Sequence, residues 1–573
     1  MMRTQEADQT PPRHLSNGDE AARKVPKGGW ITSSFLLGSI FGISVSLTGA
    51  LANLIVYLIK EYNVKSIDAA QIGNIVSGCT SLAPVAGAIV ADAFFGCYPV
   101  IVFSAIVSFL SSILFTLSAA IKSLRPPHCA FGSSTCESSS AGQIAFLYLA
   151  VALLSVGTAG TRFNVLSMGA SQFDKVENQN IFFNWYFIVI YAAGIIGSTV
   201  FVFIEDSISW TLGFGLSAAI NAISIVVLLL GAKYYRKPAA QGSPFTGLAR
   251  VVVAAANKWN VEVPQENPNY YHGEGGSGND KTNLDFAPTQ SLRFLNRAAL
   301  ICHGEISSDG SLAKPWRLCT VQQVQDLKAL VSIFPLWSSS IFLSVSIGIQ
   351  YSLTVLQALT MDRSVGPRFS IPAGSISVSS LAATMLALSL LDRLVLPLWR
   401  RLTRHTPTPL QRIGLGHALN IAAMAASALV ERKRAGVVHA HHAEGQAGWE
   451  VPMTALWLVV PMVVTGVGEA LHFPGQVALY YEEFPRSLRN TSAGMMSVLI
   501  GLGFYLSTAM VDLVRRNTGW LPDNINAAKM ENVYWLVTVL TVVNFGYYVV
   551  CAMLFKHQNG GHEEGDDNID QGH

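Results

Sequence analysis

The feature that most constrains this chain is a series of twelve apolar segments, each long enough to cross a lipid bilayer. A membrane-spanning helix needs about 20 mainly apolar residues. Inside the hydrocarbon the backbone polar groups must bond to one another, so each segment is expected to be a helix. We therefore predict an all-α membrane protein with 12 transmembrane helices, at residues 31–58, 69–91, 98–120, 144–165, 182–204, 210–231, 329–353, 371–398, 413–430, 452–472, 490–514 and 532–555.

The composition excludes most other classes of protein. The chain is 50% hydrophobic and 13% charged, whereas an ordinary soluble domain is roughly 25% charged. Its formal net charge of +2 gives no basis for nucleic-acid binding. The seven cysteines show no CxxC and no Cys/His ligand spacing, so we expect no metal and no cofactor. GxSxG, HExxH and P-loop motifs are absent as well, so an enzyme has the least support.

A long polar insert divides the twelve segments into six and six. The chain is therefore expected to have five parts. These are a cytosolic N-terminal segment (1–29), an N-terminal six-helix half (30–231), a cytosolic linker (232–328), a C-terminal six-helix half (329–556) and a disordered acidic tail (557–573).

The distribution of Lys and Arg predicts that both termini lie in the cytosol. Loops that are inside in this orientation hold more of these residues, although the middle insert supplies much of the excess. The first 29 residues are polar, so no cleavable signal peptide is expected. Within the linker, residues 248–259 form an amphipathic pattern, which predicts a helix along the membrane surface or the inner face of the protein.

Cys129 and Cys136 lie together in the loop between the third and fourth segments, which is outside in this orientation. An outer compartment permits a disulfide between them. Two free thiols are the alternative, because a sequence does not give the distance between the two Cα atoms.

Ionisable side chains inside a span are costly and are functional candidates by default. Arg162 in the fourth segment and Glu469 in the tenth lie at similar depths in the cytosolic half. They come from different six-helix halves, so this pair of opposite charges can close a gate on the inner side and separate when that side opens. The alternative is that both reach the inner water layer and only anchor their helices.

Arg162 has a second candidate role. A guanidinium is planar and always charged, and its parallel N–H donors match a planar oxyanion. A lone arginine in an otherwise neutral cavity indicates an anionic substrate. His472 and Gln350 are weaker candidates for cavity side chains, because a buried structural histidine and a polar residue packed between helices are more common.

Residues 87–96 (GAIVADAFFG) resemble the inner-loop motif of the major facilitator superfamily. Small residues such as Gly87 and Gly96 permit close helix approach, and Asp92 can cap or pair at the start of the next helix. Cys97 departs from the motif, which usually has Arg after its last glycine.

Further motifs make the chain similar to the plant nitrate/peptide transporter family, also called the proton-dependent oligopeptide transporter family. The resemblance runs from the first segment to the twelfth, and these motifs carry it: GASQFD (169–174), FFNWY (182–186), FLNRAA (294–299), FPLW (334–337), PLQR (409–412) and NVYW (532–535). Three stretches most resemble the nitrate-excretion-transporter-like clade: NLIVYL (53–58), KSIDAAQI (65–72) and GSPFT (242–246). The resemblance implies the major facilitator fold and a plant membrane transporter of nitrate, in a clade whose members are not uniform in substrate.

One departure from the family pattern bears on mechanism. Proton-coupled members carry E-x-x-E-[RK] in the first segment, and the matching positions here are Ile40, Ile43 and Ser44. Isoleucine cannot load a proton, so the standard coupling route is in doubt. The family's basic position in the fourth segment is retained as Arg162 and its acidic position in the tenth as Glu469.

Two mechanisms follow from this departure. The protein is a uniporter that carries an anion downhill, which a negative cell interior turns toward efflux, or Glu469, together with His472, takes the coupling role. The first is favoured. Tyr191, at a position where the family usually has Asn, is a further departure.

The sequence therefore predicts a low-affinity nitrate transporter that works by alternating access. One alternative is a proton-coupled carrier of other plant substrates such as peptides, glucosides or hormones, and another is a nutrient sensor that does not transport. The expected partners are a small anion or plant metabolite and the lipid bilayer. The plasma membrane is the expected location, with the vacuolar membrane as the alternative.

Overall fold

The computed structural model describes residues 28–127, 129, 137–237, 244–261, 269–273, 288–289, 291–302, 305, 314, 316–405, 407–483 and 492–567. These described residues contain 12 helices long and apolar enough to cross a membrane, which confirms the predicted number. The spans are Trp30–Tyr62, Ser66–Phe95, Cys97–Ala120, Ala141–Ala170, Glu177–Ile208, Trp210–Lys233, Val321–Leu359, Ala373–Leu402, Pro409–Ala440, Ala455–Tyr480, Gly494–Asn517 and Met530–Phe555.

The N-terminal half consists of six spans, some of which are interrupted. Its helices are α1 (Trp30–Tyr62), α2 (Ser66–Val90), α3 (Cys97–Ala120), α4 (Ala141–Ala159), α5 (Arg162–Ala170), α6 (Val176–Ile196) and α7 (Trp210–Leu230). Short π-helical turns extend α2 as η1 (Ala91–Phe95) and continue α6 as η3 (Gly197–Phe201) and η4 (Ile204–Ile208).

The C-terminal half repeats this plan. Its helices are α10 (Val321–Leu359), α11 (Val378–Leu390), α12 (Leu396–Thr403), α13 (Pro409–Ala440), α14 (Val459–Glu483), α15 (Ser492–Asn517) and α16 (Met530–Asp567). The short turn η7 (Ala373–Ser377) leads into α11, and the strands β1 (Met361–Asp362) and β2 (Val451–Thr454) pair in parallel. The linker contains α8 (Pro244–Asn257) and α9 (Arg293–Asn296), followed by the short turn η6 (Arg297–Ala299).

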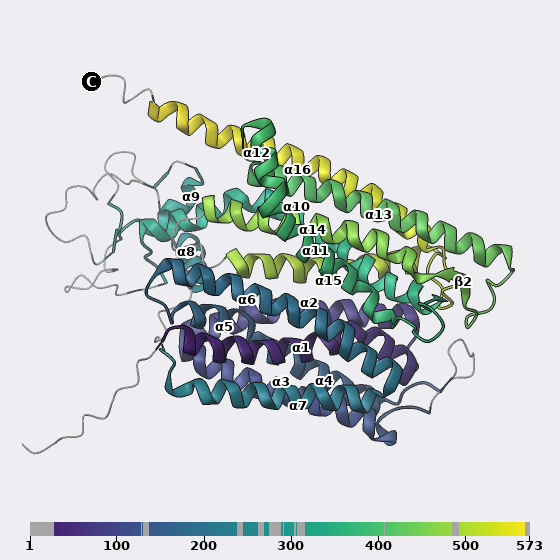
Figure 1. The fold of residues 1–573 in the computed structure, drawn as a ribbon. Coiled ribbons are helices and arrows are strands. Elements are labelled where there is room, and N and C mark those ends of the chain that lie inside the picture. Colours follow the sequence, from purple (N-terminus) through teal and green to yellow (C-terminus); the bar gives the residue numbers. More distant parts are fainter. Residues whose placement is uncertain are drawn as a thin grey trace, which may run out of the picture.

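The two halves lie side by side with their long helices roughly aligned (Figure 1). The start of α1, the linker helices and the end of α16 share one end of the molecule, which we call the linker end; the opposite end carries β2 and is called the β2 end. The halves meet where α2 packs along α15. A Cβ added to Gly501 would lie 2.5 Å from Leu82 Cγ and 3.2 Å from the carbonyl oxygen of Gly78, so glycine permits this approach.

Apolar packing shows which end is closed. One buried cluster contains residues of both halves, among them Leu54, Tyr57 and Leu353, and it includes Val451 of β2. Toward the linker end, the buried apolar residues form separate clusters within each half. The molecule is therefore closed at the β2 end, and its halves are not packed together in the same way at the linker end.

The linker helix α8 packs onto the protein by its apolar face. Val251, Ala254 and Ala255 are buried in a cluster with η6 and with Val324 at the start of α10. Val252 on the opposite face is 53% exposed. The predicted amphipathic helix therefore packs against the rest of the protein at the linker end, while its position relative to a membrane stays a prediction.

The helices differ from the predicted segments at three places. The first helix of the C-terminal half starts at Val321 instead of 329, because Thr320 and Gln323 form a capping box there. The fourth span is not continuous, because α4 ends at Ala159 and α5 begins at Arg162. The helix α16 continues to Asp567, into the tail predicted to be disordered, since extending an existing helix costs far less than starting one.

Candidate functional site

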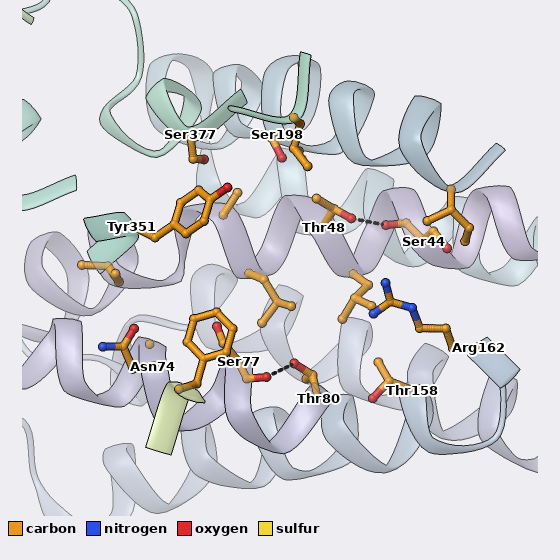
Figure 2. Close-up of a pocket in the computed structure, with 18 of the residues that line it drawn as sticks. Ser44, Thr48, Asn74, Ser77, Thr80, Thr158, Arg162, Ser198, Tyr351 and Ser377 are labelled. Atoms are coloured by element: carbon orange, nitrogen blue, oxygen red, sulfur yellow. Dashed lines mark hydrogen bonds between the residues drawn. The ribbon is translucent and has the colours of Figure 1, made fainter. Parts of the chain in front are cut away.

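A cavity of about 320 Å³ lies between the two halves and receives side chains from both. The N-terminal half supplies most of the lining, from α1, α2, the break between α4 and α5, α6 and η3. The C-terminal half contributes α10, η7, α11 and α15. In Figure 2, Arg162 and Thr158 lie toward one end of the cavity, and Tyr351 and Asn74 toward the other.

Arg162 is the first residue of α5, directly after the break in the fourth span. Its guanidinium points into the cavity (Figure 2). It makes no hydrogen bond or ion pair with the part of the chain that the structure describes. Of the described lining residues, Arg162 alone is charged at neutral pH. An uncompensated guanidinium in a largely neutral cavity can bind an anion.

Contacts from neighbouring helices fix the position of Arg162. The hydroxyl of Tyr186 on α6 donates to the Arg162 carbonyl at 2.6 Å. The amide of Asn164 donates to the carbonyl oxygens of Gly160 at 3.2 Å and Gly87 at 3.3 Å. A Cβ added to Gly87 would lie 1.9 Å from the Ala159 carbonyl oxygen, so α2 touches the break itself.

The wall formed by α1 is apolar where the family pattern has carboxylates. Ile40, Ile43 and Ser44 all line the cavity. The next turn offers hydroxyl groups, with Thr48 Oγ1 donating to the Ser44 carbonyl at 2.8 Å (Figure 2). The departure predicted from the sequence therefore lies at the cavity surface, beside the arginine.

Glu469 on α14 is half-buried and is not among the lining residues. Its carboxyl lies near Thr384 and near Tyr351, which does line the cavity. The predicted ion pair between Arg162 and Glu469 is absent among the described contacts. Tyr191 on α6 is close enough to both charges to interact with them electrostatically.

The β2 end carries ion pairs that join the two halves. Asp68 on α2 pairs with Arg515 on α15, and Lys65 Nζ lies 2.6 Å from Asp523 Oδ2. Asp206 on η4 lies 3.7 Å from Arg363, which follows α10. Sequence reasoning missed these residues, because most of them lie in short loops or at helix ends outside the predicted spans.

Polar contacts lie just beneath these ion pairs. Ser375 Oγ donates to the Ser198 carbonyl at 2.7 Å, and Asn74 Nδ2 donates to Ser352 Oγ at 3.3 Å. Both contacts join the halves, so the closure at the β2 end is several layers deep.

Gln350 and His472 do not line this cavity. Gln350 is fully buried, donates to Ser427 Oγ at 3.1 Å and accepts from Thr465 Oγ1 at 2.5 Å. His472 is fully buried against His417, with ring centroids 5.0 Å apart. In this conformation both residues pack within the C-terminal half.

The remaining predicted positions are structural. Gly96 precedes α3 with a φ of 78°, a conformation that glycine adopts without strain. Asp92 does not cap α3, whose N-cap is Gly96 without a side-chain hydrogen bond. Cys129 is disulfide-bonded. Its predicted partner Cys136 lies outside the described residues, so that pairing stays a prediction.

A further charged residue lies inside a span. Glu205 stands one residue beyond the predicted fifth segment, but the observed span continues to Ile208. No group of three or more His, Cys, Asp or Glu residues that could hold a metal is found within the described ranges.

Comparison with known proteins gives a consistent picture. A model of the POT family matches residues 98–530. The Arabidopsis thaliana protein NRT1/PTR FAMILY 2.7 is 47% identical over 540 residues, covering 94% of this chain and 95% of that protein. NRT1/PTR FAMILY 2.3 of the same organism is 46% identical over 544 residues, covering 95% of each.

Solved structures share the fold. An auto-inhibited POT family peptide transporter has a TM-score of 0.67 at 16% identity, covering 91% of this chain and 97% of that one. The POT family transporter PepTSo has a TM-score of 0.65 at 15% identity, covering 94% and 99%. The architecture of two six-helix halves is therefore that of the major facilitator fold.

Proposed function

Since the chain belongs to the POT family of membrane transporters, we propose that it carries a small anion, with nitrate as the expected substrate, through the cavity that Arg162 faces. The single observation that carries this proposal is the unpaired guanidinium of Arg162, the one charge among the described lining residues. A planar anion can accept two parallel N–H donors from it. Hydroxyls of Thr158, Thr161 and Thr48 also line the cavity and can replace lost water.

The direction of opening follows from the closed β2 end. We propose that the β2 end faces the outside and the linker end the cytosol of a plasma membrane, which places both termini inside. The described conformation then has a closed outer side and access toward the cytosol. Transport requires the halves to rock, so that the ion pairs and the apolar cluster at the outer side separate.

Arg162 and Glu469 are proposed to close the inner side. They lie in different halves and carry opposite charges, and they are apart in a conformation that is closed outside. When the halves rock together at the inner side, the two charges approach each other near Tyr191. A bound anion competes with Glu469 for the guanidinium, so that loading and gate opening are linked.

The proposed mode is uniport. Ile40 and Ile43 give the cavity an apolar wall at the positions where the family pattern has acids. Because no acid at these positions can carry a proton along with the anion, each transported anion moves one net negative charge across the membrane. A cell interior that is negative then favours efflux.

A second candidate function is proton-coupled transport of a larger organic substrate. The cavity of about 320 Å³ falls at the small end of the range for organic ligand sites. Glu469 lies near Tyr351, which contacts the cavity, so a carboxyl is within reach of such a substrate. A third possibility, a sensor that does not transport, is distinguished from both candidates by the flux measurement described next.

The test is nitrate flux in oocytes that express the full chain, measured in both directions with labelled nitrate at external pH 5.5 and 7.4. The variants are Arg162→Ala, Arg162→Lys and Glu469→Gln, each with its surface level measured. Arg162→Lys is the matched control, because it keeps the charge and loses the planar donors.

Uniport predicts flux that is insensitive to the pH gradient as a driving force, is abolished in Arg162→Ala and is strongly reduced in Arg162→Lys. Flux driven by the proton gradient and lost in Glu469→Gln would replace uniport by coupling through Glu469. A surface-expressed protein without nitrate flux in either direction would overturn the nitrate proposal.

A further inference from the structure

Glu205 is a buried acid that the transport mechanism above does not use. It lies on η4 near the β2 end, with 1% of its surface exposed. The glycine at position 213 of α7 makes room for it, because a Cβ there would lie 2.3 Å from Glu205 Cγ. The side chain is therefore seated between α7 and α1.

The hydrogen bonds of Glu205 are incomplete. Asn53 Nδ2 on α1 donates to Glu205 Oε2 at 3.1 Å. Glu205 Oε1 and Asn53 Oδ1 are both buried without a hydrogen-bond partner among the described residues. When the carboxyl is ionised both atoms are acceptors only. A proton on Glu205 removes the charge and supplies the donor that this group lacks.

The charged groups around Glu205 do not compensate an ionised carboxylate. Its neighbour Asp206 is also acidic. Two cations near η4, Lys60 of α1 and Arg363 after α10, pair with Asp206, at 2.5 Å and 3.7 Å. Neither α7 nor η3, which pack against η4, contains an ionisable side chain. Burying a carboxylate without a cation is costly, so the closed conformation favours the neutral acid.

The Glu205–Asn53 pair lies at a contact between the halves. Gly374 of η7 packs so closely on α1 that an added Cβ would lie 2.5 Å from the Ala52 carbonyl oxygen and 3.2 Å from Asn53 Oδ1. The next residue, Ser375, bonds the Ser198 carbonyl at 2.7 Å. Separation of the halves at the β2 end removes Gly374 from Asn53 and opens the pair to water.

We infer that Glu205 and Asn53 form a proton-binding site that controls opening at the β2 end. The site holds a proton while that end is closed. When the β2 end opens, water enters and hydrates the carboxylate of Glu205. The proton then leaves to that same side. Closing the β2 end again requires the proton to return. Because Glu205 does not line the cavity in the closed conformation, this proton is exchanged with one side only and is not carried across the membrane.

The inference is tested through the conformation, so its outcome does not depend on the substrate. Ser375→Cys in the full chain places a thiol at the contact between the halves. A membrane-impermeant maleimide is applied from the β2 side between pH 5 and pH 8, and the labelling rate is compared with that of Ser375→Cys/Glu205→Gln. The thiol is the same in both proteins, so the ratio of the two rates removes its own pH dependence.

We expect the ratio of the Ser375→Cys rate to the double-variant rate to rise with pH, by up to about tenfold per pH unit once the site begins to lose its proton. Glutamine cannot ionise, so the double variant stays mainly closed. The matched control is Ser375→Cys/Glu61→Gln. Glu61 is a part-buried acid at the same end, paired with Arg125 within one half. This control should keep the profile of Ser375→Cys alone.

A ratio that stays flat from pH 5 to pH 8, or that rises toward acid, overturns the inference. Asn53→Ala gives a second measurement if the glutamine variant does not reach the surface. Without the Asn53 donor the ionised carboxylate loses its one hydrogen bond, so the pH-dependent rise in labelling must move to higher pH. A profile unchanged by Asn53→Ala also overturns it.

Discussion

The hydroxyl of Tyr186 holds the carbonyl of Arg162 at 2.6 Å, at the point where the fourth span is interrupted. The carbonyl belongs to the residue that presents the guanidinium to the cavity. Tyr186 is buried on α6, so a second helix determines the position of Arg162, the residue proposed to bind the anion. This arrangement separates the charge of Arg162 from its placement, and the two can be tested independently.

Tyr186→Phe removes this hydrogen bond and keeps the ring. We expect the KM for nitrate to rise about fivefold with an unchanged surface level, since one net hydrogen bond is worth about 1 kcal/mol. Concentration-dependent flux in oocytes measures it. Tyr148→Phe, on the exposed side of α4, is the matched control and should leave KM unchanged. An unaltered KM in Tyr186→Phe would show that Arg162 is held by other contacts.

Asp68→Asn breaks a bridge between α2 and α15. Both side chains are partly exposed, so the expected effect is modest: about 0.2–1 kcal/mol, or up to about fivefold in the fraction open at the β2 end. Labelling of Ser375→Cys from the β2 side measures that fraction. The charge swap Asp68→Arg/Arg515→Asp should label more slowly than the single variant without reaching the parental rate, because Arg515 also pairs with Asp523 at 3.0 Å and the swap breaks that second pair. If the swap labels as fast as the single variant, the pair does not hold the end closed.

Gly501→Val tests the close approach of α15 to α2. A valine here collides with Leu82, and overpacking of this kind costs about 1–3 kcal/mol. We expect the β2-closed conformation to lose about 5- to 150-fold in population, with a parallel loss of flux. Gly546→Val on α16, where an added Cβ meets nothing within 4 Å, is the matched control. Equal flux in the two variants would contradict the prediction.

Asp174 belongs to the GASQFD motif and makes a bidentate pair with Arg236, at 2.6 Å and 3.1 Å. The guanidinium holds the pKa of this carboxyl below its usual range. A lowered pKa stabilises the fold above the carboxyl's ordinary value of about 4, and the effect disappears as the pH falls through the lowered value.

We therefore expect Asp174→Asn to melt slightly earlier than the parent in detergent at pH 7, and the difference to shrink as the pH is lowered toward 3. Thermal unfolding at both values measures this, with Lys175→Gln, an exposed neighbour, as the control. A difference in melting temperature between Asp174→Asn and the parent that does not shrink at low pH would show that the ion pair with Arg236 is not its cause.

The sequence was sufficient for the parts of the structure that depend on local composition. Twelve apolar stretches are visible without any tertiary information, because a bilayer imposes a minimum length on each span. Arg162 was identifiable for the same reason: a charge within such a stretch is rare. Ile40 and Ile43 were notable only by comparison with the family pattern, which has acids at these positions, and the structure places both at the cavity.

Contacts between distant segments could not be predicted in this way. Asp68 and Arg515 are 447 positions apart, and nothing near either one marks its partner. Glu205 cannot be recognised in the same way, because the apolar segment ends one residue before it, whereas π-helical turns continue the span past it. His472 is polar and close to Glu469 in the chain, but its direction on α14 leads into the packing around His417.

The apolar cluster that joins both halves at the β2 end gives the protein a temperature response. Opening that end exposes side chains such as Leu54 and Leu353 to water. Hydration of apolar surface raises the heat capacity, so the free energy of opening is a curved function of temperature. The attraction between the two faces of the cluster weakens on cooling. Cooling therefore shifts the protein toward the conformation that is open at the β2 end, before any substrate or proton binds.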